Sequence, residues 1–212
     1  MAISRKGNVG RVSGKIGNVV TYTLYGALVE RSIGKRVAPV TGPELVNRQK
    51  TAITSAFLRP VHNFIQTGYE LEAKRELKTQ YSLVTSYIRL NAIAGTYPNQ
   101  YVDCEKVLFS KGKMPAIAKP TVEKDNNGLV FTWDNSMLLT GIKDTDQVML
   151  MAYVPERNAC LYKLCAAVRK DGVAYLPIPK NGKSLIIETY FSFISENRKN
   201  IANSIYTGRL IW

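Results

Sequence analysis

The sequence predicts an α+β fold: a glycine-rich β arm or hairpin and a helix pair, followed by an antiparallel β-sandwich of the immunoglobulin or fibronectin type III kind. Three observations lead to this prediction. Apolar residues alternate in residues 19–25, recur at helical spacing between residues 43 and 94, and form seven short strand-like segments after residue 97. We therefore expect the basic β arm and helical hairpin in residues 1–96 and the sandwich in residues 97–212.

The arm contains two strand-like segments. Residues 19–25 predict one face with Val20, Tyr22 and Leu24, and an opposite face with Thr21, Thr23 and Tyr25. Gly26 interrupts the alternation, and residues 27–33 form a second extended segment, so a loose hairpin or a pair of short strands is predicted. Such a segment cannot close a core alone. It must pack on the rest of the protein or on a neighbouring subunit.

The helical region begins after Thr41, where Pro43 and Glu44 are a good start signal. Pro60 is expected to break or kink the first helix, with a continuation over 61–66. A second helix is predicted from about Glu70 to Ala92, ended by Gly95, which gives an antiparallel helix pair. The expected buried residues are Leu45, Gln49, Ala52, Ile53, Ala56 and Phe57 on the first helix, and Leu77, Tyr81, Val84, Ile88 and Asn91 on the second.

The sandwich is predicted from strands separated by turn residues. The predicted strands are 121–124, 129–133, 147–154, 159–169, 173–178, 184–195 and 201–209, after an extended segment at 101–110. Asp125-Asn126-Asn127-Gly128 has the chemistry of a hairpin turn. Trp133 and Tyr190 are expected core aromatics, and the chain lacks the Cys…Trp…Cys spacing of an antibody-type domain.

Composition indicates a globular protein with an acidic partner. Hydrophobic residues make up 45% of the 212 residues, no apolar run is long enough to span a membrane, and the first ten residues lack a signal-peptide core, so we expect synthesis in a cytoplasm. Three cysteines without a CxxC motif are expected as free thiols.

The net charge of +13 is unevenly distributed. Residues 1–60 hold ten Lys and Arg against two acids, whereas residues 61–212 hold nineteen against fourteen. This asymmetry predicts contact with nucleic acid or an acidic protein surface, although a merely basic soluble protein would have the same composition. The candidate partner-binding residues are Arg5, Lys6, Arg11, Lys15, Arg31, Lys35 and Arg36.

The segment from Gly7 to Asn18 resembles a phosphate-binding loop, but its spacing excludes one. With Gly14-Lys15 as the G-K pair, the first glycine position holds Val9 and the hydroxyl position holds Ile16. The residues that follow are strand-like, so no helix N-terminus is predicted to bind an anion. Its glycines are better interpreted as allowing a basic arm to turn tightly against another backbone.

Other candidate sites are weak. His62 is the only histidine and has no acid–base partner in its turn, so it is expected to be a partly exposed helix residue. Asp144-Thr145-Asp146 resembles the start of a calcium loop without the glycine and distal Glu; a polar loop is the simpler interpretation. We predict no catalytic residues, no metal and no cofactor, and hence a protein that is not an enzyme.

Several blocks along the chain resemble a family of uncharacterised basic proteins of about this length, classed as a domain of unknown function and known from Bacteroidetes-type bacteria and their phages. The blocks are Gly10–Val20, Glu30–Ser32, Thr41–Glu44, Asn47–Gln49, Phe57–Pro60, Tyr101–Asp103, Ser110–Gly112, Phe131–Trp133 and Ala202–Gly208. The resemblance covers nearly the whole chain and implies no catalytic residues. It implies a genomic setting near phage, which favours a virion or assembly protein.

Two functions are therefore expected. The first is a non-enzymatic structural protein of a bacteriophage virion, of the neck, connector-ring or capsid-associated kind, which forms a homo-oligomer, contacts other virion proteins and no membrane, and has possible non-specific contact with DNA. The alternative is a basic nucleic-acid-binding accessory protein. The C-terminal Leu210-Ile211-Trp212 could be a docking anchor, although packing on its own domain is the simpler expectation.

Overall fold

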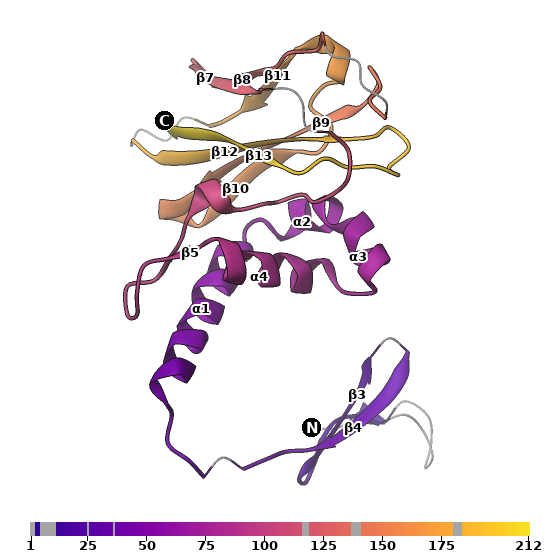
Figure 1. Ribbon diagram of the computed structural model, residues 1–212, viewed down its shortest axis with the longest axis vertical. Helices are drawn as coiled ribbons and strands as arrows, with labels where there is room; N and C mark the ends of the chain where they lie inside the picture. Colours follow the sequence, from indigo (N-terminus) through magenta and orange to yellow (C-terminus); the bar gives the residue numbers. More distant parts are fainter. Residues whose placement is uncertain are drawn as a thin grey trace. The chain divides into compact units, whose positions relative to one another are not determined.

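The computed structural model describes residues 3–4, 12–24, 26–35, 37–115, 119–136, 141–179 and 184–212. The chain divides into two compact units, Met1–Thr41 and Gly42–Trp212 (Figure 1). The boundary predicted at residue 96 falls inside the second unit, between its helices and its two larger sheets.

The first unit is an antiparallel sheet with the strand order β1-β2-β3-β4. Its strands are β1 (Ile3–Ser4), β2 (Val12–Ile16), β3 (Val19–Leu24) and β4 (Ala27–Ser32). Gly17, with a φ of 57°, lies in the turn between β2 and β3, and Gly26, with a φ of 83°, precedes β4. The predicted pair of strands is confirmed, and β2 extends it within the glycine-rich segment.

Four helices in the described part of the second unit replace the predicted helix pair. They are α1 (Gly42–Leu58), α2 (His62–Gly68), α3 (Glu70–Glu76) and α4 (Gln80–Asn91). The break after α1 is at the predicted Pro60. The single helix predicted from Glu70 to Ala92 is wrong, because Leu77 adopts a left-handed conformation with a φ of 52°. Thr79 then starts α4 by accepting a hydrogen bond from the Ser82 amide at 3.2 Å.

The predicted buried stripes are also wrong in part. Only the C-terminal part of α1 is covered, and its buried residues are Thr54, Phe57 and Leu58. The side chains expected to be buried but found exposed are Leu45, Ala52, Ala56, Leu77, Tyr81 and Asn91. Helical spacing therefore located the helices without showing how far along them the core extends.

Two antiparallel sheets follow the helices, joined to them through the short pair β5 (Ile93–Ala94) and β6 (Tyr101–Val102). The three-stranded sheet has the order β11-β8-β7, and the four-stranded sheet has the order β10-β9-β12-β13. The bounds are β7 (Thr121–Asp125), β8 (Gly128–Thr132), β9 (Gln147–Val154), β10 (Ala159–Lys163), β11 (Val173–Pro177), β12 (Ile186–Ile194) and β13 (Ile205–Ile211). The hairpin turn at 125–128 is confirmed, whereas the strand predicted over 159–169 ends at Lys163.

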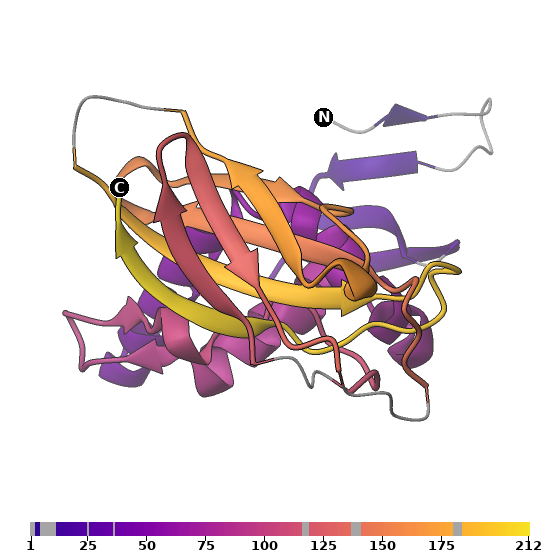
Figure 2. The ribbon, with the colours of Figure 1, turned by 90° about the horizontal axis from the view of Figure 1, so that it is seen from above.

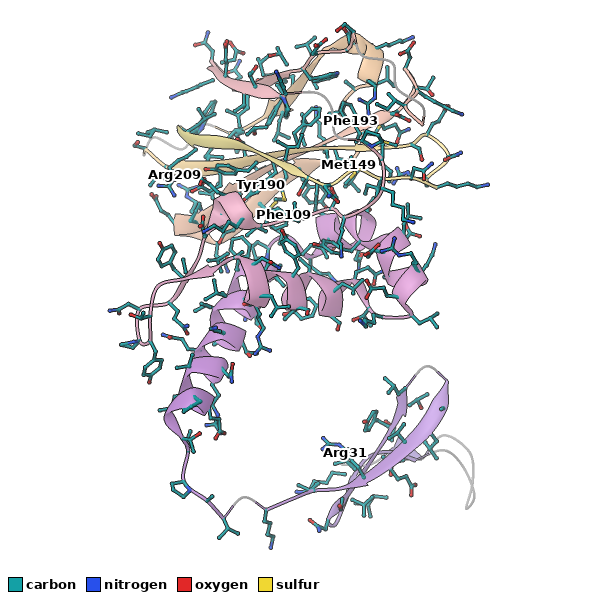
Figure 3. All side chains as sticks on the ribbon, viewed as in Figure 1. Arg31, Phe109, Met149, Tyr190, Phe193 and Arg209 are labelled. Carbon is teal, nitrogen blue, oxygen red and sulfur yellow. The ribbon has the colours of Figure 1, made fainter. Side chains whose placement is uncertain are left out.

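The second unit has three layers, because the four-stranded sheet is covered on both faces (Figures 1 and 2). Side chains alternate along β9: Leu150 packs in a core between the two sheets, and Met149 packs in a second core against the helices. In the same way Phe193 points towards the three-stranded sheet and Tyr190 towards the helices (Figure 3). A layer of helices behind the sandwich was not predicted.

The expected core aromatics are confirmed. Trp133 packs in the first core, with its ring 5.3 Å from that of Phe191. Tyr190 packs in the second, 4.6 Å from the ring of Phe109. Trp212 is buried in the first core and its backbone exchanges two hydrogen bonds with Leu185, so the C-terminal tryptophan packs on its own domain. No helix in the described residues is long and apolar enough to cross a membrane.

Candidate interaction surfaces

Two of the predicted basic residues lie in one row across the N-terminal sheet. Lys15 pairs with Val20, which pairs in turn with Arg31, so the three side chains share a face. Lys15 and Arg31 are exposed, and so is Lys35, which follows β4 (Figure 3). The other predicted residues, Arg5, Lys6, Arg11 and Arg36, lie outside the described residues.

The same face carries apolar side chains. The register places Tyr22 opposite Val29 and Leu24 opposite Ala27, on the side of the sheet that holds Val20. Among the described residues of the first unit, only Thr21 on the opposite face is buried; its hydroxyl donates to Glu30 at 3.5 Å. The first unit is therefore a single layer of strands whose described residues form no apolar core.

The glycine-rich segment is not a phosphate loop in its described part. Val12–Ile16 is a strand, and at Gly17 the chain turns into β3 rather than into a helix. No helix N-terminus follows Lys15 to bind phosphate oxygens. Residues 7–11 of this segment lie outside the described residues.

A basic cleft lies in the second unit, at the C-terminal side of α3. It has a volume of about 270 Å³, and its charged lining residues are Glu72, Arg75, Lys111, Lys113 and Lys199. We call these five residues the basic cleft. Glu72 is only 3% exposed and accepts contacts from Arg75 at 2.6 Å and Lys111 at 3.1 Å. Four cations and one carboxylate give the lining a formal charge of +3.

Three chain segments build this cleft, and close backbone approaches hold them. The Lys111 amide donates to the Gly68 carbonyl at 3.0 Å, which ties the segment after Phe109 to the end of α2. Gly112 lies so close to Ile201 that a Cβ would collide with the Ile201 carbonyl oxygen. The Ser195 hydroxyl accepts from the amides of Lys199, at 3.1 Å, and Asn200, at 2.9 Å, which fixes the loop between β12 and β13.

A second polar cluster surrounds Glu188 on β12. Its carboxylate is 1% exposed; it accepts from the Tyr206 hydroxyl at 2.6 Å and from Arg209 Nε at 2.8 Å. Cys104 and Tyr206 line an adjoining cavity of about 420 Å³. Burial, reinforced by Glu188, raises the pKa of the Cys104 thiol to about 11. The thiol is therefore protonated at neutral pH and is a poor nucleophile.

The Asp144–Asp146 loop faces a cation, but that cation belongs to the chain. The Asp146 carboxylate is buried, accepts from the Lys143 amide at 3.0 Å and lies 3.4 Å from Nε of the buried Arg169. At this distance the contact is an ion pair rather than a hydrogen bond. The Arg169 guanidinium also stacks on Phe193, 3.5 Å from the ring centroid, and burial lowers its pKa.

His62 is exposed at the start of α2, and its Nε2 lies 3.1 Å from Gln66 Nε2. Within the described ranges, no group of three or more His, Cys, Asp and Glu side chains gathers in a geometry that would hold a metal ion. The polar clusters of the second unit are instead ion pairs between the chain's own side chains.

Comparison with known proteins places the chain in a family. The model of a family of unknown function (DUF6266) matches residues 11–208. The chain belongs to DUF6266. No curated protein and no solved structure matches it. The predicted resemblance to an uncharacterised family is thereby confirmed.

The DUF6266 match includes the basic cleft as well as Lys15, Arg31 and Lys35, whereas Arg5 and Lys6 precede it. The analysis of charge along the sequence did not find the cleft, because its cations come from three segments far apart in the chain. Local signals were present: Ser110-Lys111-Gly112-Lys113 and Arg198-Lys199-Asn200 are basic segments next to glycine or asparagine. They were interpreted only as family blocks and turns.

Proposed function

We propose that this DUF6266 protein is a non-enzymatic structural protein that assembles into a larger particle through its N-terminal sheet. The observation that carries the proposal is a sheet without a core of its own. Ile16, Leu24 and Leu28 are each about half exposed on it, with printed exposures of 56%, 47% and 45%. A lone layer of strands is marginally stable in water, so it gains most of its stability from the surface it covers.

The charges on this sheet favour an acidic protein surface as that partner. Lys15 and Arg31 flank Val20 in one row, so a partner must satisfy two cations around an apolar centre. An acidic patch with an apolar middle is complementary to such a row. We propose that the patch belongs to a second copy of this chain or to another protein of the same particle.

We further propose that the particle is a bacteriophage virion, with this protein in the neck, in a connector ring or on the capsid. The resemblance of its sequence blocks to proteins of bacteria and their phages supports this proposal. Terminase, portal and capsid genes beside its own gene are the expected setting. A neighbourhood of metabolic genes in every genome that carries the family would contradict the virion assignment.

The two larger sheets support an immunoglobulin-related sandwich as the scaffold. If the strands from β7 to β13 are lettered A, B, C, C′, E, F and G, the sheets have the orders A-B-E and C′-C-F-G. In immunoglobulin folds strands A, B and E likewise share one sheet, and C, F and G share the other. The same scaffold occurs in many proteins of unrelated function, so it does not itself assign one.

The test is the mass of the purified protein by size-exclusion chromatography with light scattering. We expect the wild-type chain to form an oligomer and the double variant Lys15→Glu, Arg31→Glu to be a monomer with an unchanged thermal midpoint. The matched control is Lys143→Glu, Lys170→Glu, which changes the net charge equally at two exposed lysines of the second unit. A monomeric wild-type protein that joins no particle would overturn the proposal.

The same row of cations favours a nucleic-acid-binding accessory protein as the second candidate function, because Lys15 and Arg31 could contact adjacent phosphates. This alternative predicts affinity for duplex DNA that falls steeply with salt, and that drops when Lys15, Arg31 and Lys35 are replaced by Ala. Fluorescence anisotropy measures both effects. Unchanged binding by the triple variant would exclude this candidate.

A further inference from the structure

The basic cleft holds more positive charge than the chain neutralises. Glu72 is its one carboxylate, and it is shared by Arg75 and Lys111. Nearby Glu76 pairs with Lys78 at 2.9 Å. Within the part of the chain that the structure describes, neither Lys113 nor Lys199 forms an ion pair. Two ammonium groups are therefore left to a ligand.

The cations converge because the backbone holds them together. The contact of Gly112 with Ile201 fixes Lys113 beside the loop that carries Lys199, and the Ser195 hydroxyl holds that loop. Like charges held close to one another repel, and the chain would not gather them without a compensating gain. An anion in the cleft supplies that gain.

The charge and lining indicate which anion fits. A phosphate group carries a charge of about −1.5 to −2 and three acceptor oxygens, which matches the surplus on the lining better than the single charge of a carboxylate. Lys113 and Lys199 each offer three donors, and Arg75 has donors beyond the one that contacts Glu72. The other lining residues are Leu71, Gly112, Asn200 and Ile201, so no aromatic ring is available to stack on a base.

We propose that the basic cleft is a phosphate-binding site, in which Lys113 and Lys199 contact the phosphate oxygens and Glu72 positions Arg75 and Lys111 beside them. Its volume of about 270 Å³ suits a phosphate rather than a whole nucleotide. The phosphate is either that of a small ester or one unit of a nucleic-acid backbone. This site is separate from the N-terminal sheet and does not depend on the proposed function.

The first experiment is calorimetric titration of the full chain with inorganic phosphate, with ionic strength held constant by chloride. We expect saturable binding that weakens at least tenfold in Lys113→Ala, Lys199→Ala. The control Lys143→Ala, Lys170→Ala removes two exposed lysines from another loop and should bind phosphate as the wild type does. Absence of phosphate binding by the wild type, or an equal loss in both double variants, would overturn the proposal.

A second titration distinguishes the two sources of phosphate. Short duplex DNA is followed by anisotropy at several salt concentrations for the wild type and both double variants. If the ligand is a nucleic-acid backbone, Lys113→Ala, Lys199→Ala should lower the slope of log affinity against log salt by about 2. If that variant loses phosphate binding and keeps its DNA affinity, the site takes a small phosphate ester.

Discussion

The N-terminal sheet and the four-stranded sheet of the second unit differ in what covers them. In the first, Thr21 alone is buried among the described residues, and apolar side chains such as Leu24 and Leu28 stay half exposed. In the second, seven of the eight residues of β9 are buried, because one face packs on a sheet and the other on helices. The strands are similar in length, so the difference lies in their neighbours.

This difference teaches that substitutions in the two sheets should affect different measurements. A side chain in the four-stranded sheet contributes to the free energy of unfolding of the single chain. A side chain on the N-terminal sheet contributes little to that free energy and acts through association with whatever covers the sheet. The predictions below test or refine this separation, beginning with the largest expected effect.

Phe193→Ala should lower the free energy of unfolding of the second unit by about 4 kcal/mol, because it leaves a cavity in the first core. The loss includes the edge-to-face contact with Phe191, whose ring lies 4.8 Å away. Leu24→Ala in the N-terminal sheet should cost less than about 1 kcal/mol of single-chain stability, since its side chain is half exposed. Urea unfolding followed by tryptophan fluorescence measures both. Equal losses would show that the N-terminal sheet is part of the cooperative core.

Asp146→Ala should destabilise the second unit by about 3 kcal/mol, because it leaves the buried Arg169 guanidinium without its carboxylate. We place the loss at the low end of the usual range since Arg169 also stacks on Phe193. The control Asp144→Ala removes an exposed carboxylate from the same loop and should change stability by less than about 0.5 kcal/mol. A calcium-dependent melting temperature in the wild type would contradict our assignment of Arg169 as the cation of Asp146.

The sequence predicted the hairpin turn and most strands of the second unit because local patterns specify them. Asp125 and Gly128 bound a two-residue loop, and residues 147–154 begin and end as predicted. The runs in β9 and β12 are nearly continuous and apolar, which is typical of strands buried on both faces. That signal could have predicted the helical layer behind the sandwich. We interpreted these runs only as sandwich strands.

Other features depend on contacts that local patterns do not contain. The helix break at Leu77 requires a left-handed leucine, which a propensity argument does not anticipate, although Thr79 is a typical N-cap residue. The basic cleft joins Arg75 to Lys199, which are far apart in the chain. Its assembly depends on tertiary contacts such as that of Gly112 with Ile201. Charge counted along the sequence directed attention to the N-terminal quarter instead.

Alkaline pH should weaken the second unit, because its second core buries weak acids. Burial raises the pKa of the Cys160 thiol to about 12 and that of the Tyr153 phenol to about 12. Below about pH 8 both the folded and the unfolded chain keep these protons. As the pH rises from about 9 to 12 the unfolded chain releases them first, so the free energy of unfolding falls.

Urea midpoints at pH 8 and at pH 11 measure this loss. The midpoint should be lower at pH 11, and Cys160→Ala should reduce the difference between the two values. Cys165→Ala is the matched control, because Cys165 is exposed. If Cys160→Ala left the difference unchanged, the alkaline loss would have to come from the buried phenols.

The smallest perturbation is thiol labelling at neutral pH, which reports local opening without a change of sequence. Cys165 is exposed and should react with a disulfide reagent at the rate of an accessible thiol. Cys104 and Cys160 are partly covered, and burial raises the pKa of both, so they should react at least tenfold more slowly because less thiolate is present and access is limited. Phe193→Ala should speed the labelling of Cys160, since global unfolding then exposes it more often, whereas Leu24→Ala should not. Faster labelling of Cys160 in Leu24→Ala would mean that the N-terminal sheet protects the second unit, and the separation between the two sheets would fail.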